Sequence, residues 1–457
     1  MRTRGWLALV PSTAAALTLA CATLNAATLT VGPAGDHASI QAALTAAAPG
    51  DTVLVAAGTY SGGPNTNLDF AGKGVTLLSE GGAASTAIDC QGAARAFSFT
   101  SGEDTTSVVR GFTIAYGYDG TSGGAVYCYG SSPKLAECRF VWNAAGTAGS
   151  GGLGGAVYVE QSQVVVQDCL FRDNTADDGA GMFARNSVST VRGTSFVDNV
   201  ATNGGGGLRI LYNGGTITRC TFAGNTAPTY GGGVYFCYSS PVFRNCTLAY
   251  NAASQGGAAY GFDATPTFTN CIVAHSTEGT AFYCPGTSVF TIDHCCVYGN
   301  EGGDEPCGNA SDNIFEDPLL CASTEGVLTL EDCSPCLGAG QGGGDIGAWG
   351  IGCLCGSSSG IPEDSGTLAL GAAPNPLHEW TTFTFVVPPG GSQVDLLVYD
   401  ARGRQVAALA SGRLSAGPAL FAWDGRSDAG SRVASGVYFA RLALGGLHST
   451  AKLVLLR

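Results

Sequence analysis

Apolar and polar positions follow one pattern in the first three quarters of this 457-residue chain and another pattern after it. Up to residue 355, short runs of β-branched, aromatic and small residues are separated by Gly, Asn and Ser, as in Val164-Val165-Val166. Such short runs are typical of strands rather than of amphipathic helices. After residue 366 the apolar runs become longer and the earlier spacing stops. The chain is therefore predicted to be all-β, with a repetitive region followed by a small non-repetitive one.

The repetitive region contains a motif that returns about every 26 residues. It reads apolar-x-x-Cys-x-Phe-x-x-Asn and is followed by a Gly-Gly-x-apolar-Tyr run. A strand-rich repeat of this length indicates a solenoid whose coils consist of short strands and turns. Stacked coils place equivalent residues about 4.8 Å apart along the axis. The Cys position of successive copies is occupied by Cys138, Cys169, Thr194, Cys220, Cys246, Cys271 and Cys295.

Alignment of the copies predicts two stacks of side chains. The Phe position predicts an inward aromatic ladder, and the Asn position predicts an asparagine ladder at a turn, where Asn tolerates left-handed backbone and stacked amides bond along the axis. The aromatic ladder comprises Phe140, Phe171, Phe196 and Phe222, continued by Leu248, Val273 and Val297. The asparagine ladder comprises Asn143, Asn174, Asn199, Asn225, Asn251 and Asn300.

Only residues 39–48 show a convincing helical pattern. Ser39 can serve as the N-cap, and apolar residues such as Ile40 and Leu44 share one face. A solenoid must cover its end coils, because otherwise they expose sheet edges. We therefore expect this helix to cap the N-terminal end, and the Cys-rich residues 321–355 to close the other end.

Several segments resemble the right-handed parallel β-helix, or pectin-lyase-like, superfamily. They are Ser39-Ile40-Gln41-Ala42-Ala43-Leu44, Gly50-Asp51-Thr52-Val53-Leu54-Val55, Gly58-Thr59-Tyr60, Asp317-Pro318-Leu319, Ser334-Pro335-Cys336 and Asp345-Ile346-Gly347-Ala348. The resemblance implies that residues 28–355 form a right-handed parallel β-helix. It does not imply an activity, because this fold hosts many functions.

The non-repetitive region follows a Gly/Ser-rich linker at 356–366 and spans residues 367–457. Its alternating runs predict about seven strands and a small Ig-like β-sandwich. Five segments are similar to the C-terminal sorting domains of the type IX secretion pathway and to the Ig-like domain of the flagellar hook-assembly protein. They are Pro374-Asn375-Pro376, Val398-Tyr399-Asp400-Ala401-Arg402-Gly403, Trp423-Asp424-Gly425, Ser435-Gly436-Val437-Tyr438-Phe439 and Lys452-Leu453-Val454-Leu455-Leu456-Arg457. The resemblance implies an export or attachment module recognised by export machinery, with a passive spacer as the alternative.

The start of the chain predicts export. Arg2 and Arg4 precede an apolar stretch that ends in small residues, which is typical of a signal peptide, here assigned to residues 1–27. Processing as a lipoprotein at Cys21 is the alternative. We expect a secreted or bacterial cell-surface protein, and no later stretch is long and apolar enough to predict a membrane span.

The net charge limits the classes of partner, and the cysteine content indicates the redox compartment. The formal net charge of −14 disfavours nucleic acid and, without metal ions, acidic polymers. Eighteen cysteines fit an oxidising compartment, although those in the ladder are interpreted as buried thiols. Disulfides are instead expected among the cysteines near the end of the repeats. These are Cys307, Cys321, Cys333, Cys336, Cys353 and Cys355.

Asp177-Asp178 is the best candidate for chemistry, because it resembles the paired-Asp element of polygalacturonases. The Gly-His-Gly element of that family is absent, and an acidic structural loop is the alternative. Arg185 and Arg209 occupy near-equivalent positions of consecutive coils, close to these carboxylates. Asp177, Asp178, Arg185 and Arg209 are thus the candidate residues for a sugar-acid groove, with exterior charge pairs as the competing interpretation.

Metal binding has weaker support. His294 precedes Cys295-Cys296, and Cys333 and Cys336 with Cys353 and Cys355 have spacing compatible with zinc, but ladder membership and disulfides explain them as well. We therefore predict no metal or cofactor, with Ca²⁺ as the alternative worth testing.

Aromatic residues are the remaining functional signal, because those outside the core can stack on sugar rings. They are Tyr116, Tyr118, Tyr127, Tyr129, Trp142, Tyr158, Tyr230, Tyr235, Tyr238 and Tyr250. We expect a monomeric, non-catalytic protein that binds an extracellular polysaccharide or has a structural role. A polysaccharide lyase or glycoside hydrolase acting along the β-helix face is the alternative, favoured if the four candidate residues converge.

Overall fold

The computed structural model describes residues 26–147, 149–322, 327–355, 370–373, 381–387, 392–400, 404–414, 417–423, 425–428, 431–444 and 447–455. The chain divides into two compact units, Met1–Ser359 and Gly360–Arg457. The predicted linker lies outside the described residues, and so does the predicted signal peptide apart from residues 26 and 27. No described helix is both long and apolar enough to cross a membrane.

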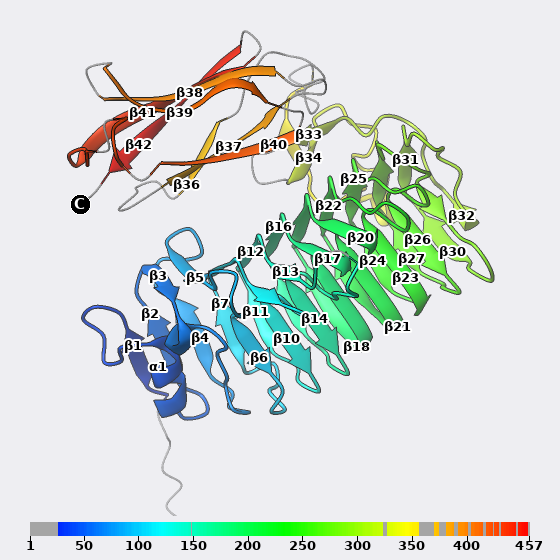
Figure 1. Ribbon diagram of the computed structural model, residues 1–457. Coiled ribbons are helices and arrows are strands. Elements are labelled where there is room, and N and C mark those ends of the chain that lie inside the picture. The colour runs from blue at the N-terminus through cyan, green and yellow to red at the C-terminus, as the bar shows by residue number, and fades with distance from the viewer. Residues whose placement is uncertain are drawn as a thin grey trace, which may run out of the picture. The chain divides into compact units, whose positions relative to one another are not determined.

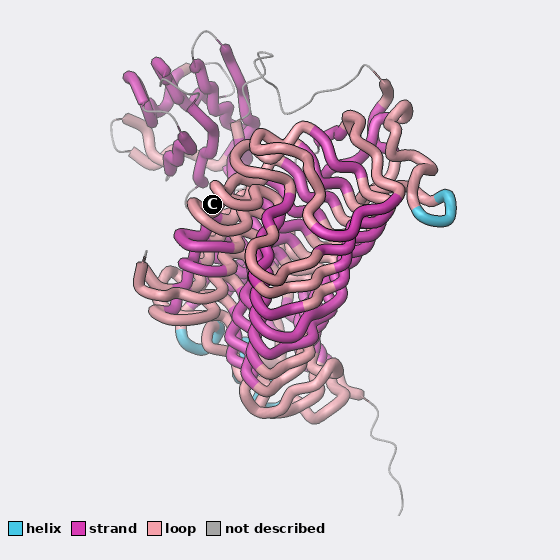
Figure 2. The backbone as a smooth tube through the Cα atoms, turned by 90° about the vertical axis from the view of Figure 1, so that its right-hand side faces the viewer, coloured by secondary structure: helices cyan, strands magenta, loops and turns pink. Residues whose placement is uncertain are grey.

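The first unit is a solenoid of parallel strands (Figure 1), with each coil stacked on the previous one (Figure 2). An eighteen-stranded sheet, sheet A, and a ten-stranded sheet, sheet B, form its long walls, and a short sheet C lies beside them. Sheet A comprises β1 Thr28–Val31, β2 Thr52–Val55, β4 Thr76–Ser79, β6 Phe97–Phe99, β7 Val108–Arg110, β10 Val126–Tyr129, β11 Lys134–Ala136, β14 Val157–Glu160, β15 Val165–Gln167, β18 Met182–Arg192, β21 Leu208–Thr218, β23 Val234–Ser239, β24 Val242–Arg244, β26 Ala259–Phe262, β27 Thr267–Thr269, β29 Phe282–Tyr283, β30 Phe290–Asp293 and β32 Gly308–Ser311.

The other sheets have one strand from each coil that they cross. Sheet B comprises β3 Gly58–Ser61, β5 Thr86–Asp89, β8 Thr113–Ala115, β12 Arg139–Val141, β16 Leu170–Arg172, β19 Ser195–Val197, β22 Thr221–Ala223, β25 Thr247–Ala249, β28 Ile272–Ala274 and β31 Cys296–Tyr298. Sheet C comprises β9 Tyr118–Asp119, β13 Ala144–Ala145, β17 Thr175–Asp178 and β20 Val200–Gly204. The predicted parallel β-helix is confirmed.

The helix α1 covers the N-terminal coil, as predicted (Figure 1). It spans Ile40–Ala46, and the Ser39 hydroxyl accepts a hydrogen bond from the Ala42 N–H at the N-cap. Ile40 and Leu44 are fully buried in the apolar core of the solenoid. A short 3-10 helix, η1, follows at Gly63–Asn65.

The predicted aromatic ladder forms the centre of the solenoid. Phe140, Phe171 and Phe196 stack with ring centroids 4.7 Å apart, and Phe196 stacks on Phe222 at 4.8 Å. All four rings are fully buried. The period of the repeat therefore fixes an inner column at the spacing of parallel strands.

The asparagine ladder also forms, but its backbone conformation differs from the prediction. The Asn174 Nδ2 donates to Asn199 Oδ1 at 2.9 Å and to the Phe140 carbonyl at 3.0 Å, and this pattern repeats along the column. The left-handed residue is the one before each Asn, such as Trp142 with φ 55° and Asp173 with φ 55°. The explanation from the left-handed tolerance of Asn was therefore wrong. The amides are placed by burial and by their hydrogen bonds to neighbouring coils.

The cysteines separate into thiols and disulfides. All six ladder cysteines are buried free thiols, as predicted, because stacked side chains point the same way. Three disulfides join Cys284 to Cys307, Cys321 to Cys353 and Cys333 to Cys355. Cys336, expected among the disulfides, is a fully buried thiol, and that part of the prediction was wrong.

The C-terminal coils lead into a segment that lies along the outside of the solenoid. β33 Leu320–Ala322, β34 Leu328–Glu331 and β35 Ile351–Cys353 form a small sheet. The 3-10 helix η2 Gln341–Gly343 lies between β34 and β35 in the chain. Residues 337–349, here named the C-terminal strap, return over the outer face of sheet B. The Ala348 N–H donates to the Thr247 hydroxyl at 3.0 Å, and the Trp349 Nε1–H donates to the Thr221 hydroxyl at 3.1 Å. Residues 321–355 were expected only to close the end, so their reach along sheet B is new information.

The second unit contains two antiparallel sheets, as predicted for an Ig-like sandwich. One comprises β36 Gly371–Ala373, β37 Thr381–Val387 and β40 Gly417–Trp423, and the other comprises β38 Ser392–Asp400, β39 Gln405–Leu414, β41 Gly436–Leu444 and β42 Leu447–Leu455. Phe383 from the first sheet and Leu396 from the second are fully buried in one core. Trp423 contacts Tyr438 edge-on at 5.3 Å and donates its indole N–H to the Arg426 carbonyl. The Pro374-Asn375-Pro376 segment lies outside the described residues.

Candidate functional site

Asp177 is a structural carboxylate. It is only 6% exposed, and its oxygens accept the N–H groups of Gly149, Gly151 and Gly152 and the hydroxyl of Thr202. Burial alone would raise the pKa of Asp177, but these hydrogen bonds outweigh burial and hold the pKa below its ordinary value. With its oxygens occupied by the loop, Asp177 is not available as a general acid or base.

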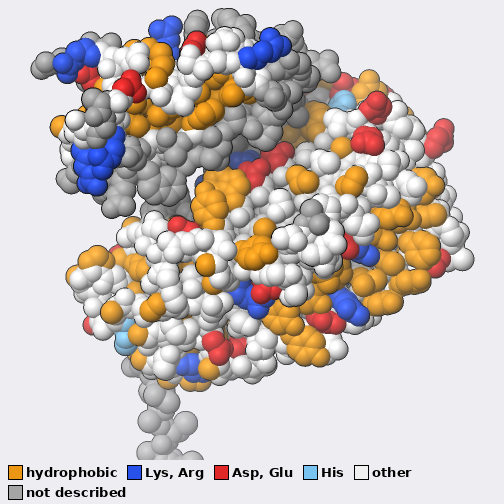
Figure 3. Space-filling model, viewed as in Figure 1, with side chains coloured by type: hydrophobic (Ala, Val, Ile, Leu, Met, Phe, Trp, Pro, Cys, Tyr) orange, Lys and Arg blue, Asp and Glu red, His pale blue; other side chains and the backbone are white. Residues whose placement is uncertain are grey.

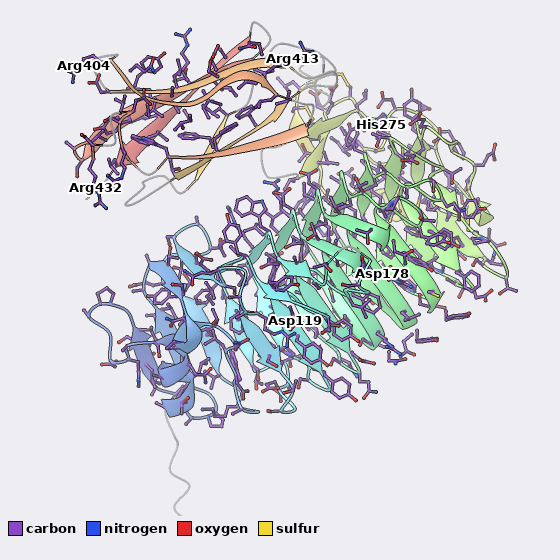
Figure 4. The ribbon with its side chains drawn as sticks, viewed as in Figure 1. Asp119, Asp178, His275, Arg404, Arg413 and Arg432 are labelled. Carbon is purple, nitrogen blue, oxygen red and sulfur yellow. A yellow bond between two sulfur atoms is a disulfide. The ribbon has the colours of Figure 1, made fainter. Side chains whose placement is uncertain are left out.

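Asp178 forms an ion pair with Arg209 inside an aromatic setting. Both side chains are 13% exposed, and Asp178 Oδ1 also accepts the Asn203 amide at 2.9 Å. The Arg209 guanidinium lies 4.3 Å from the ring centre of Tyr235 and 5.5 Å from that of Phe183. Burial raises the pKa of Asp178, and the Arg209 charge opposes that rise. Figure 4 shows Asp178 midway along the solenoid, on the same face as Asp119.

Arg185 does not join this group. Its Nε lies 3.6 Å from Glu160 Oε1, and its side chain is 42% exposed. Arg209 pairs in register with Phe183 rather than with Arg185, whose partner is Leu211. Arg185 and Arg209, expected at near-equivalent positions, are offset by two residues along these paired strands. The structure thus brings Asp178 and Arg209 together, whereas Asp177 is engaged by its loop and Arg185 lies near Glu160, so the four candidate residues do not converge on one point.

The histidines and late cysteines have structural partners. His275 stacks on Tyr250 at 5.3 Å, and His294 Nδ1 lies 3.0 Å from Asp293. Disulfides engage Cys333, Cys353 and Cys355, which corresponds to the disulfide alternative considered for these cysteines. Among the described residues, Asp293, His294 and Asp312 bring three possible ligand atoms within 4.8 Å of one another. This acidic group lies on the surface and, by itself, indicates no ion.

A row of aromatic residues follows the outer face of sheet A. Consecutive coils place six rings and one Arg in register: Tyr127, Tyr158, Phe183, Arg209, Tyr235, Tyr260 and Tyr283. Tyr127 stacks on Tyr158 at 5.5 Å, and Tyr260 stacks on Tyr283 at 5.7 Å. The central members are nearly buried, with Tyr158 at 4% and Tyr235 at 8% exposure. Four of the six rings in this row, those of Tyr158, Phe183, Tyr235 and Tyr260, are thus buried against neighbours and support the surface beside them.

Exposed rings lie next to this row, at the turn that follows it. Tyr212 and Tyr238 stack at 5.5 Å and are 42% and 47% exposed, and Tyr238 also contacts Phe262 edge-on. We name four rings the aromatic flank: the exposed pair Tyr212 and Tyr238, the half-buried Phe262, and Tyr283, which is the exposed last member of the row. Figure 3 shows hydrophobic side chains gathered over this part of the solenoid, where Figure 1 labels β21, β23 and β26.

A second exposed stack occurs at the turn between sheets B and C. Tyr116 and Trp142 stack at 5.4 Å with an interplanar angle of 15°, and Trp142 is 38% exposed. A hollow of about 430 Å³ lies beside them, lined also by Asp89, Gln91 and Tyr118. The exposed aromatics that sequence reasoning singled out therefore include Trp142 and Tyr238, whereas Tyr158 and Tyr235 belong to the supporting row.

An acidic pair continues the column of Trp142 into the next two coils. The Asp173 N–H donates to the carbonyl of Val197 at 3.3 Å, which places Asp173 beside Asp198. Burial and then the Asp198 charge raise the pKa of Asp173 to about 6. Desolvation by the surrounding protein also raises the pKa of Asp198, and the Arg172 charge opposes that rise, although Asp198 is an exposed residue by surface area. Sequence reasoning did not pair these residues. Comparison of the position before each ladder Asn would have revealed them.

Comparisons with known proteins match both units. Residues 155–318 match the model of the right handed beta helix region, and residues 378–444 match that of the FlgD Ig-like domain. Dimeric latent PorU from Porphyromonas gingivalis is 24% identical over 22% of this chain and 10% of its own, with a TM-score of 0.18. The enzymatically active domain of tailspike protein 4 from bacteriophage CBA120 is 11% identical over 88% of this chain and 64% of its own, with a TM-score of 0.27. The aligned part spans less than two thirds of either structure, and no curated protein sequence matches this chain.

Proposed function

We propose that this chain, a right-handed β-helix followed by a FlgD-type Ig-like domain, is an exported bacterial protein that binds polysaccharide through its aromatic flank. In this proposal the β-helix holds the ligand and catalyses no reaction. The Ig-like domain serves export or surface attachment, and the protein is secreted or held at the outer cell surface. The signal-like residues 1–27 and the similarity of the second unit to sorting domains support this destination.

The observation that carries the proposal is the exposed stack of Tyr212 and Tyr238. Both have left-handed backbone, with φ 57° and 49°, a conformation that bulky residues rarely adopt. Asn186 and Asp263 occupy the same turn in neighbouring coils, where their side chains make that conformation less costly. Rings placed at such positions and left exposed indicate a role for the ring itself. A stacked, accessible aromatic face is suited to the apolar face of a sugar ring.

The charge of the chain limits the class of polysaccharide that can bind. A protein with a net charge of −14 repels polyanions unless cations bridge the two. The nearest cations of the flank are already engaged, since Arg209 pairs with Asp178 and Arg185 lies near Glu160. We therefore propose that the flank binds a neutral polysaccharide, and that Ca²⁺ is required if an acidic one binds.

The test measures binding of the mature chain, residues 28–457, to immobilised neutral and acidic polysaccharides with and without Ca²⁺. Tyr212→Ala/Tyr238→Ala is expected to weaken binding at least about tenfold, because two aromatic contacts are lost. Val188→Ala is the matched control, since Val188 is 56% exposed on the same sheet without an aromatic ring. Unchanged binding of the double variant, or no binding by the wild type, would refute the proposal.

A second candidate function is glycoside hydrolysis, favoured by the Asp173–Asp198 pair beside Trp142. Glycosidases use two carboxyl groups that flank the scissile bond, one of them with a raised pKa. The same mixtures should therefore be assayed for new reducing ends and unsaturated products. Product formation that Asp173→Asn or Asp198→Asn abolishes would replace binding by catalysis as the function of the β-helix.

A further inference from the structure

The hollow beside Tyr116 and Trp142 has the composition of a small binding pocket. Its volume of about 430 Å³ lies between coils, where β5, β8 and β12 end and sheet C begins. One wall is the stacked pair of rings, and the small residues Gly92, Gly117 and Ala144 leave room beside it. The hollow is open to solvent, and its volume leaves room for one small molecule or one residue of a polymer.

The aromatic wall is held in a conformation that its side chains do not favour. Tyr116 and Trp142 have φ values of 54° and 55°, whereas Gly224 and Gly299 occupy the same turn in later coils at no steric cost. The two rings are nearly parallel, with centroids 5.4 Å apart, and Trp142 is 38% exposed. The turn therefore presents a planar platform wide enough for one sugar ring.

Polar groups face the hollow from the neighbouring coil. Asp89 Oδ1 accepts the Gln91 N–H at 2.9 Å, which orients the carboxylate and leaves its second oxygen as an acceptor. The Gln91 side chain and the Tyr118 hydroxyl add further donors and acceptors to the lining. An aromatic platform with a few polar groups at its edge matches the two kinds of surface on a sugar ring, which are apolar C–H groups and peripheral hydroxyls.

Carboxylates dominate the charge around the platform. Asp89 lies in the lining, and Asp173 and Asp198 follow Trp142 along the column of turns. Arg172, on the strand just before Asp173, opposes the charges of both Asp173 and Asp198. A carboxylate-bearing sugar would thus meet like charge on two sides.

We infer that the hollow beside Tyr116 and Trp142 is a separate carbohydrate subsite that accepts an uncharged sugar ring and rejects uronic acids. The hollow lies at the turn between sheets B and C. The aromatic flank lies on sheet A, in β21, β23, β26 and β29. The subsite therefore does not depend on the aromatic flank. The subsite gains its specificity from the surrounding carboxylates, whereas the flank gains its affinity from exposed aromatic area.

The test uses the full mature chain with Tyr212→Ala/Tyr238→Ala, so that the flank is disabled. Its probes are a neutral glucose hexasaccharide and a galacturonate hexasaccharide, titrated by calorimetry and by tryptophan fluorescence. We expect the neutral probe to bind and the acidic probe to bind at least about tenfold more weakly. Trp142→Ala is expected to abolish binding of the neutral probe, and Trp142→Phe, which keeps an aromatic face, to retain most of it and thereby to control for folding.

A separate variant tests the repulsion between the subsite and acidic sugars. Asp89→Asn is expected to raise the affinity for the galacturonate probe relative to the neutral probe several-fold, because it removes the like charge in the lining. Absence of binding by the neutral probe, equal binding of both probes, or unchanged binding in Trp142→Ala would each overturn the inference. Because the flank is disabled in every arm, none of these results bears on the proposed role of Tyr212 and Tyr238.

Discussion

Two acidic pairs lie within neighbouring coils of this solenoid, and they differ in what surrounds them. Asp177 and Asp178 are adjacent in sequence, yet one accepts loop amides and the other pairs with Arg209. Asp173 and Asp198 are far apart in sequence but adjacent in space, and their pKa values are raised. Neither Asp173 nor Asp198 forms an ion pair with any of the residues that the structure describes. The conspicuous pair is structural, whereas the inconspicuous pair keeps raised pKa values that the Arg172 charge opposes only in part.

The difference follows from strand geometry. Successive side chains of a strand point to opposite sides, so two adjacent aspartates cannot readily direct both carboxyl groups at one substrate. Equivalent positions of consecutive coils lie about 4.8 Å apart and point the same way. In a β-helix, a pair of cooperating carboxyl groups is therefore more readily built from residues one coil apart than from a dipeptide.

The largest expected effect concerns Asp178. In Asp178→Ala, the Arg209 guanidinium keeps its mostly buried position without a carboxylate, so we expect a loss of about 3 kcal/mol in the free energy of unfolding of the β-helix. Chemical denaturation followed by tryptophan fluorescence measures it. Asp178→Ala/Arg209→Met is expected to regain part of the loss. If the single variant is as stable as the wild type, the pair contributes no stability.

Asp177 is expected to have the next largest effect. Asp177→Ala leaves the N–H groups of Gly149, Gly151 and Gly152 without their acceptor, which predicts a loss of about 2 kcal/mol and faster hydrogen exchange in this loop. Because the folded-state pKa is lowered, the contribution of Asp177 is present above the unfolded value near 3.8 and is lost as the pH falls through the folded value. Thr202→Val, which removes one hydrogen bond of the same set, should show a smaller loss in the same direction.

Asp173 is expected to act in the opposite direction. Its folded-state pKa of about 6 lies above the unfolded value of 3.8, so the folded state is favoured below pH 3.8 and this advantage is lost as the pH rises through 6. Asp173→Asn is therefore expected to stabilise the protein at pH 7 to 8 by on the order of 1 kcal/mol, with no gain near pH 4. Denaturation at several pH values measures this. A gain that does not depend on pH would exclude carboxyl ionisation as its cause.

The smallest effect is expected at Arg185. Its side chain is 42% exposed and lies 3.6 Å from Glu160, so Arg185→Gln should change the unfolding free energy by less than about 0.5 kcal/mol. The same denaturation assay in low and high salt serves as the measurement. A loss as large as that of Asp178→Ala would show that exposure does not separate structural pairs from surface pairs in this solenoid.

The repeat made the interior predictable and left the exterior largely unpredicted. Phe171, Asn199 and Cys246 follow from the motif, because stacking requires the same residue type to fill the same space in each coil. The left-handed residue was misplaced, because turn geometry depends on the residue before the Asn rather than on the Asn itself. The strand periods likewise predicted the Ig-like unit, since its inward residues alternate along long strands.

The candidate sites were less predictable, because they lie on positions that the repeat does not constrain. The position of Trp142 and Asp173 varies in residue type from coil to coil, so only a comparison down that column would reveal the platform and the acidic pair. The exposure of Tyr238 and the burial of Tyr235 depend on neighbouring turns, which a sequence pattern does not specify. The position of the strap could not be predicted for another reason. Its contacts join residues that lie far apart in the chain, such as Thr221 and Trp349.

The strap also changes how this solenoid should unfold. In a simple repeat protein each coil contacts only its neighbours, so the end coils open one at a time. Here the strap is anchored to Thr221, Thr247 and Asn270, which lie in three successive coils. Opening of the C-terminal end must release these contacts together, so the last coils form one cooperative unit. Without the strap, the same coils would open one after another from the C-terminal end.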